Sequence, residues 1–178
     1  MNRISLPKEN DEQIKRFKKA CEKYIGRFDS MDSKAHISFP SYAFDLGSSR
    51  DVFNHIDYYQ IIENHLKVTP PIDLKITGFD FLVHGKLRTI CAKLDLDQMT
   101  MHWFNRVTGI FKPIKRINPH ITIAKTISLG SFNILWPHFQ KLEFTDTFSV
   151  RKITILHKYS DETGPFRFYK EISLRKGN

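Results

Sequence analysis

The sequence has 178 residues, enough for one domain with a substantial core but short for two, so we predict a single domain over 1–178. Apolar residues make up 40% and aromatic residues 13%, which argues against disorder, and no run approaches the ~18 apolar residues of a membrane-spanning helix. The net charge of +9 favours an anionic partner, namely nucleic acid, a phosphorylated small molecule or a membrane surface, although a merely basic surface fits it equally well.

The two cysteines, Cys21 and Cys91, match no metal-binding, redox or disulfide spacing, and both lie in apolar surroundings. They are therefore expected to be buried free thiols in a reducing compartment. The N-terminal segment turns charged after Leu6 and contains no secretory signal. Together these features predict a cytoplasmic protein.

Hydrophobic periodicity gives the expected elements in chain order. We predict a strand at 3–6, a helix at 9–25, a strand at 35–39, a helix at 52–66, a hairpin over 72–95, a helix at 96–108, a strand at 119–125, a helix at 132–142, and strands at 148–155 and 166–174. The hairpin is expected to bulge at Gly78, and the last helix to be interrupted or restarted at Pro137. Since helices and hairpins mix without strict alternation, the pattern favours an α+β fold with mainly antiparallel sheet.

The predicted strand at 119–125 alternates between its two faces. Ile121 and Ile123 point to one face. His120, Thr122 and Ala124 point to the other. A titratable imidazole and a hydroxyl group are thus expected side by side on one face of the strand.

An earlier segment, 84 residues upstream, repeats this pattern, with His36 and Ser38 on one face and Ile37 and Phe39 on the other. One His-x-Ser/Thr tripeptide is expected roughly once by chance, and the version with apolar second and fourth positions only about 0.2 times, whereas the chain has two. Either motif alone fits an edge strand that exposes its polar residues to water. The pair, each member following a helix, favours a shared function.

The paired motifs resemble the signatures of the 2H phosphoesterase superfamily, specifically its 2′-5′ RNA ligase-like and cyclic phosphodiesterase branch. The stretch of residues 119–124 is especially close to the second motif, and the order of elements is similar over most of the chain. The first motif carries Ser38 where threonine is common. Lys125 stands where many relatives carry arginine, which keeps the charge but loses the planar guanidinium fork.

The resemblance implies an α+β fold with two pseudo-symmetric lobes of mainly antiparallel sheet, helices outside, and a central groove between the motif strands. It also implies a site without metal or cofactor that acts on 2′,3′-cyclic phosphates or 2′-5′ linkages of RNA ends or nucleotides. We expect a monomer that does not bind membranes. The other histidines lack the motif context, and no pair of them has metal-ligand spacing.

The residues themselves suit this chemistry. Histidine has an ordinary pKa near 6.5, so His36 and His120 can serve as general base and general acid, each contributing ~10²–10⁴-fold to the rate. Their roles would exchange in the reverse reaction. Ser38 and Thr122 can donate hydrogen bonds to the non-bridging phosphate oxygens.

Five further residues are candidates for substrate binding. The cations are Lys125, Arg116 and Arg88, and the aromatic residues are Tyr42 and Phe39. The alternative is an ordinary surface charge for each cation and core packing for each ring. Lys125 falls on the isoleucine face of its strand unless the strand ends or bulges there.

The first hypothesis is therefore a metal-independent hydrolase, a phosphodiesterase whose reverse reaction is ligation. A second is a non-catalytic RNA-binding module of the same fold, which would grip RNA through the basic charge. A third is a cyclic phosphodiesterase for a small metabolite such as an ADP-ribose cyclic phosphate. The first and third share the two histidines and differ only in the walls of the groove.

Overall fold

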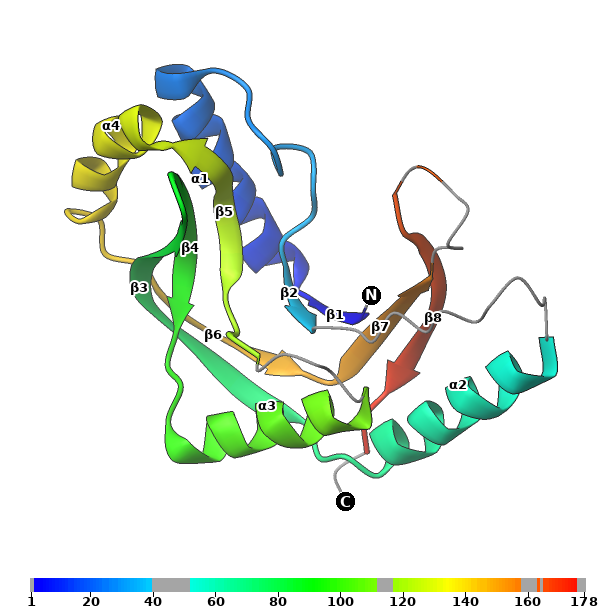
Figure 1. The fold of residues 1–178 in the computed structure, drawn as a ribbon. Helices are drawn as coiled ribbons and strands as arrows, with labels where there is room; N and C mark the ends of the chain where they lie inside the picture. The colour runs from blue at the N-terminus through cyan, green and yellow to red at the C-terminus, as the bar shows by residue number, and fades with distance from the viewer. Residues whose placement is uncertain (1, 40–51, 112–116, 158–162, 164, 176–178) are drawn as a thin grey trace.

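The computed structural model describes residues 2–39, 52–111, 117–157, 163 and 165–175, with the backbone alone for 52–58 and 157. Within these residues, antiparallel strands form two four-stranded sheets, and four helices accompany them (Figure 1). The strands are β1 (Asn2–Ser5), β2 (His36–Phe39), β3 (Ile72–His84), β4 (Leu87–Leu94), β5 (Ile121–Ser128), β6 (Thr145–Val150), β7 (Lys152–His157) and β8 (Arg167–Ser173). The helices are α1 (Lys8–Ile25), α2 (Val52–Lys67), α3 (Gln98–Ile110) and α4 (Leu129–Phe139).

The first sheet has the strand order β2-β1-β7-β8 and the second has the order β5-β4-β3-β6. Each begins at an edge strand that carries one of the two motifs, and each motif strand pairs with the strand that precedes its helix in the chain. The unit β1-α1-β2 in the first sheet thus corresponds to β4-α3-β5 in the second. The predicted α+β fold with two pseudo-symmetric lobes is confirmed.

Local sequence signals account for several element boundaries. Gly78 has a φ of 104°, a conformation that favours glycine, and the pairing of β3 with β4 shifts register there, as predicted. The side chain of Asp97 accepts a hydrogen bond from the Thr100 amide and caps α3. Ser128 caps α4 in the same way, so this helix starts earlier than predicted and continues through Pro137 to Phe139.

The prediction of a single strand at 148–155 is wrong, because the chain passes from the second sheet to the first within this segment. Val150 pairs with Ile72 in the second sheet, whereas Lys152 pairs with Ser173 in the first. Arg151 lies between the two strands, and its carbonyl accepts a hydrogen bond from the Leu174 amide. The segment therefore links the lobes.

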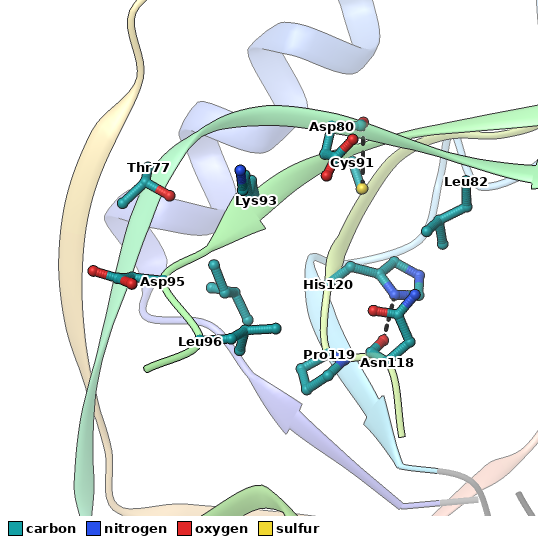
Figure 2. Close-up of a pocket in the computed structure, with 11 residues that line it drawn as sticks. Thr77, Asp80, Leu82, Cys91, Lys93, Asp95, Leu96, Asn118, Pro119 and His120 are labelled. Atoms are coloured by element: carbon teal, nitrogen blue, oxygen red, sulfur yellow. Dashed lines mark hydrogen bonds between the residues drawn. The ribbon is translucent and has the colours of Figure 1, made fainter. Parts of the chain in front are cut away.

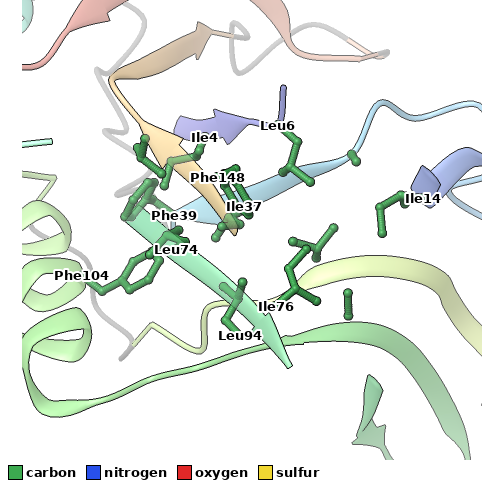
Figure 3. Packing of buried hydrophobic residues seen from close by; sticks show 14 of the residues in the cluster. Ile4, Leu6, Ile14, Ile37, Phe39, Leu74, Ile76, Leu94, Phe104 and Phe148 are labelled. Carbon is green, nitrogen blue, oxygen red and sulfur yellow. The ribbon is translucent and has the colours of Figure 1, made fainter. Parts of the chain in front are cut away.

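Each connecting helix makes contacts with the other lobe. Helix α1 joins β1 to β2 but contacts β5 and α4, and its Phe17 ring meets Phe79 of β3 edge-on at 5.1 Å. Helix α3 joins β4 to β5, but its Phe104 ring lies 6.0 Å from that of Phe39 in β2. The labelled residues of Figure 3 include members of both sheets and of α1 and α3, and all belong to one hydrophobic cluster, so the two lobes share a core.

A buried lysine holds the connector between α1 and β2. The side chain of Lys18 is 1% exposed, and its Nζ donates hydrogen bonds to the carbonyls of Ser30 and Ser33 at 2.6 and 2.8 Å. It also lies 3.0 Å from the Ser33 hydroxyl. The Ser30 hydroxyl in turn donates a long hydrogen bond of 3.4 Å to the carbonyl of Ile123 in β5. The connector that leads into the first motif is thereby tied to the strand of the second.

Both cysteines are buried free thiols, as predicted, and burial raises the pKa of each to about 12. None of the helices in the described parts of the chain is long and apolar enough to span a bilayer.

Replacing Lys18 with methionine is expected to lower the free energy of unfolding by about 2 kcal/mol, because the partly buried carbonyls of Ser30 and Ser33 would lose their donor. Lys19→Met is the matched control, since Lys19 is the exposed neighbour on the same helix. It should change stability by less than about 0.5 kcal/mol. Urea denaturation measures both, and equal stability of the two variants would contradict the role given to the Lys18 ammonium.

Candidate functional site

The first motif lies on the edge strand β2 with the predicted alternation. Ile37 and Phe39 are 0% and 1% exposed and belong to the core. His36 and Ser38 point to the opposite face, where Ser38 is exposed and lies directly across from Arg3 of β1. We call this the motif face of the first sheet.

The second motif lies on β5, where Cys91 of β4 is directly across from Thr122. The next pair in the register is Ile90 with Ala124, so β5 has one additional residue, a bulge at Ile123. Ala124 is 0% exposed and packs in the core. The prediction that it shares a face with Thr122 is therefore wrong, because the bulge reverses the alternation after Thr122.

The same bulge changes the position of Lys125. Because Lys125 follows the buried Ala124, it returns to the face of Thr122 and is exposed. We call this the motif face of the second sheet. The bulge thus places a cation three residues after the hydroxyl of the second motif and on the same side of the sheet.

The two motif strands meet, because β2 contacts β5 at the junction of the sheets (Figure 1). Their histidines are held alike. The Nδ1 of His36 lies 2.7 Å from the carbonyl of Lys34, and the Nδ1 of His120 lies 2.7 Å from the carbonyl of Asn118. A carbonyl only accepts hydrogen bonds, so Nδ1 is the protonated nitrogen in both neutral rings, and Nε2 carries the free lone pair.

The backbone before His36 is held by α1. The carboxylate of Asp11 accepts a hydrogen bond of 2.6 Å from the Ala35 amide and pairs with Lys15 at 2.8 Å. Burial raises the pKa of Asp11, but the hydrogen bonds from Lys15 and Ala35 outweigh it and keep this pKa below its ordinary value. Asp11 is therefore charged at neutral pH and fixes the residue next to His36.

The pKa of His36 is lowered from its ordinary value. Burial is the largest cause, and it outweighs the hydrogen bond to Lys34, which raises the pKa. The positive charges of Arg3, Lys18 and His120 lower it further. The imidazole of His36 is thus neutral at pH 7 and lies within the electrostatic reach of His120.

A pocket of about 420 Å³ opens on the motif face of the second sheet beside His120 (Figure 2). Its lining residues include Asp80 and Cys91, which are paired in the sheet, Lys93 of β4, and Asn118. The Cys91 thiol lies 3.3 Å from the Asp80 carbonyl, to which it donates a hydrogen bond. Because its pKa is raised, the thiol in the wall of the pocket is un-ionised. His36 is not among the lining residues, so the pocket lies to one side of the histidine pair.

The structure describes two of the remaining predicted residues, Phe39 and Arg88, and shows contacts of both that do not involve the histidines. Phe39 is core, packed against Phe104 and Phe111, which corrects its prediction as a substrate-binding ring. The guanidinium of Arg88 donates to the carbonyls of Gly85 and Leu87 at the turn of the β3–β4 hairpin. Tyr42 and Arg116 lie outside the described residues.

Arg3 is not among the residues predicted from sequence, although it lies beside Ser38 on the motif face of the first sheet. The signal was present, because Ile4 and Leu6 alternate with Arg3 and Ser5. It was weak, because a four-residue strand gives little periodicity. Among the residues that the structure describes, no three His, Cys, Asp or Glu side chains gather as the ligands of a metal ion would.

The titration of His36 can be followed by NMR of its ring protons. Its pKa should lie below 6.5 in the folded protein and return to the ordinary value in the urea-unfolded chain. The folded state then binds fewer protons than the unfolded state, so stability should decrease as the pH falls from 6.5 through the folded pKa. A folded pKa at or above the unfolded one would contradict the burial and nearby cations given as the cause.

No family model matches the sequence, and no curated protein matches it. Solved structures do. E. coli LigT complexed with NADP⁺ has 14% sequence identity and a TM-score of 0.61 over 98% of this chain and 96% of its own. TT0787 of Thermus thermophilus has 14% identity and a TM-score of 0.64 over 99% and 98%. A structure described as a phosphoesterase has 13% identity and a TM-score of 0.60 over 98% and 97%. The chain therefore has a fold similar to that of LigT over nearly its whole length.

Proposed function

We propose that this protein is a 2H phosphoesterase that cleaves a 2′,3′-cyclic phosphate or a 2′-5′ linkage at an RNA end or in a nucleotide. His36 and His120 act as the acid–base pair, without a metal ion. The reaction is reversible in principle, so the same pair would catalyse ligation.

The observation that carries this proposal is the matched setting of the two imidazoles. Each donates Nδ1–H to the carbonyl two residues earlier at 2.7 Å, and their strands are in contact. The proposed reaction needs one group that takes a proton from the attacking water and another that gives a proton to the leaving oxygen. Two histidines that are oriented alike on adjoining strands suit this pair of roles. A protein that merely binds RNA has no need of this arrangement.

In hydrolysis, we assign the base to His36, because its lowered pKa keeps it neutral at pH 7. Its Nε2 takes a proton from water as the water oxygen bonds to phosphorus. The bond from phosphorus to the ribose oxygen breaks, and His120, which enters this step as the imidazolium with protons on both ring nitrogens, gives its Nε2 proton to that leaving oxygen. A proton relay through solvent restores both rings for the next turnover.

The phosphoryl group must be held while its charge is redistributed. The hydroxyl of Ser38 and that of Thr122 lie on the same faces as their histidines and can each donate a hydrogen bond to a non-bridging oxygen. Lys125 would add charge from the second sheet. These groups bind and orient the phosphate, and none is placed to act as a nucleophile.

The nucleoside portion of the substrate fits the pocket beside His120. Its volume of about 420 Å³ is in the range of small-molecule sites, and Asp80, Lys93 and Asn118 provide polar groups for a base or ribose. E. coli LigT has been solved with NADP⁺, with 3′-AMP and with ATP, which supports a nucleotide ligand for this fold. The net charge of +9 favours such an anion.

Removing either histidine should abolish most of the turnover. We expect His36→Ala and His120→Ala each to lower kcat by about 100-fold or more, because each loses one proton-transfer group. The assay is a panel in EDTA of 2′,3′-cyclic nucleotides, RNA with a terminal cyclic phosphate, 2′-5′ dinucleotides and ADP-ribose cyclic phosphate. His102→Ala, at an exposed position of α3, is the control and should match the wild type.

Unchanged turnover in either motif variant would remove that histidine from the mechanism. A different outcome would favour the RNA-binding alternative, namely salt-sensitive RNA affinity that survives both substitutions in a protein without turnover. A preference for ADP-ribose cyclic phosphate over every RNA substrate would instead select the small-metabolite enzyme.

The assignment of base and acid can be tested with an activated leaving group. An aryl phosphodiester such as thymidine 5′-(4-nitrophenyl) phosphate needs little protonation of its leaving oxygen. The loss in His120→Ala should therefore shrink to roughly tenfold or less, while the loss in His36→Ala should remain near 100-fold. The reverse pattern would exchange the two roles.

The pH profile gives an independent check of the same assignment. For a natural ester, kcat/KM of the wild type should rise with pH along an acidic limb whose midpoint lies below 6.5, since this limb reports the free enzyme's base and the pKa of His36 is lowered.

A further inference from the structure

Arg3 has an unusual setting within the proposed site. It lies in β1, directly across from Ser38 of β2 on one side and from Thr154 of β7 on the other. Its neighbours Asn2 and Ile4 are 7% and 1% exposed and face the core. Directly paired residues in an antiparallel sheet share a face, so Arg3 lies on the motif face of the first sheet with Ser38.

The charge of Arg3 has no partner in the described part of the chain. Its Nε is buried and makes no hydrogen bond, and no ion pair involves its guanidinium. On the same face of the same sheet, Lys152 pairs with Glu171 at 2.7 Å. A half-buried arginine without an anion costs free energy, and such groups persist where a ligand supplies the missing acceptor.

The second lobe has no equivalent cation. Ser38 and Thr122 correspond as the hydroxyls of the two motifs, so the residue across from Thr122 is the counterpart of Arg3. That residue is Cys91, whose thiol is un-ionised. The two halves of the site thus match in their histidines and hydroxyls but differ in charge at the position across from each hydroxyl.

We propose that the guanidinium of Arg3 binds the phosphoryl group of the substrate, next to the hydroxyl of Ser38. This inference rests on the proposed function, and we call the place where the phosphoryl group binds the anion site. The guanidinium donates to non-bridging oxygens alongside the Ser38 hydroxyl, in the planar fork geometry that suits phosphate. Because Cys91 offers no such donor, the second motif has no guanidinium at the matching position, and Lys125 is its nearest counterpart in charge. The cation also lies near His36, whose pKa it lowers.

The test uses Arg3→Met, which removes the charge, Arg3→Lys, which keeps the charge without the fork, and Arg106→Met, which removes an exposed arginine of α3 as the control. Arg3→Met should lower kcat/KM for the best phosphodiester of the panel about 100-fold, Arg3→Lys less, and Arg106→Met not at all. The pKa of His36, followed by NMR, should rise in Arg3→Met because a nearby cation is lost.

Binding of inorganic phosphate, followed through the ring signals of both histidines, separates this inference from the proposed function because it needs no turnover. The wild type should bind phosphate, and Arg3→Met should bind it at least roughly tenfold more weakly.

If the wild type cleaves a substrate and Arg3→Met equals it in both assays, the role of Arg3 is wrong while the proposed function stands. If phosphate binding depends on Arg3 but no substrate is cleaved, the anion site stands without the phosphodiesterase. If the wild type binds no phosphate, the anion site is overturned.

Stability distinguishes binding from a structural role. Because Nε of Arg3 has no partner to lose, Arg3→Met should melt at the wild-type temperature or above it, as expected when a residue serves function at the expense of stability. A variant that loses activity together with several degrees of melting temperature, and whose His36 pKa does not change, would identify Arg3 as a structural residue and overturn the proposal.

Discussion

The buried ammonium of Lys18 is the interaction on which the arrangement of the two motifs depends. It holds the carbonyls of Ser30 and Ser33, and Ser30 reaches the carbonyl of Ile123. One charged group on α1 therefore fixes the path by which the chain enters β2 and ties that path to β5. The burial of Lys18 lowers its pKa, and the charges of Asp11 and Asp32 counteract this. A lysine in this position costs desolvation energy, and its hydrogen bonds to the connector offset that cost.

The exchange of helices makes the two lobes one unit. Helix α1 leaves the first sheet and packs on the second, and Phe104 of α3 packs on Phe39 of the first. Separating the lobes would therefore unpack α1 from the second sheet and Phe104 of α3 from Phe39. This packing keeps β2 against β5, as the proposed binding of one phosphate between the two histidines would require. Rigid elements of this kind hold catalytic groups more accurately than loops do.

The strand alternation of the first motif could be predicted from sequence, because β2 pairs without a bulge and its apolar residues are all core. The second motif could be predicted only as far as Thr122, because the bulge at Ile123 depends on the register with β4, which the sequence of β5 alone does not contain. Similarly, the change of sheet at Arg151 depends on two pairing partners far away in the chain. A hint existed, since the three-residue step from Val150 to Ile153 breaks strict alternation. Long-range register was thus the limit of prediction from sequence, more than local propensity.

Small differences between the lobes make the surroundings of His36 unlike those of His120. Two imidazoles in identical surroundings would give no reason for one of them to be the base. Here His36 is buried near Arg3 and Lys18, which favour its neutral form. The second motif has Cys91 in place of an arginine and opens onto the pocket. A phosphodiester bound between the two rings would therefore meet a neutral acceptor on one side and space for its nucleoside on the other, so the leaving oxygen would face His120. In the proposed mechanism, a duplicated structural unit would perform two different halves of one reaction.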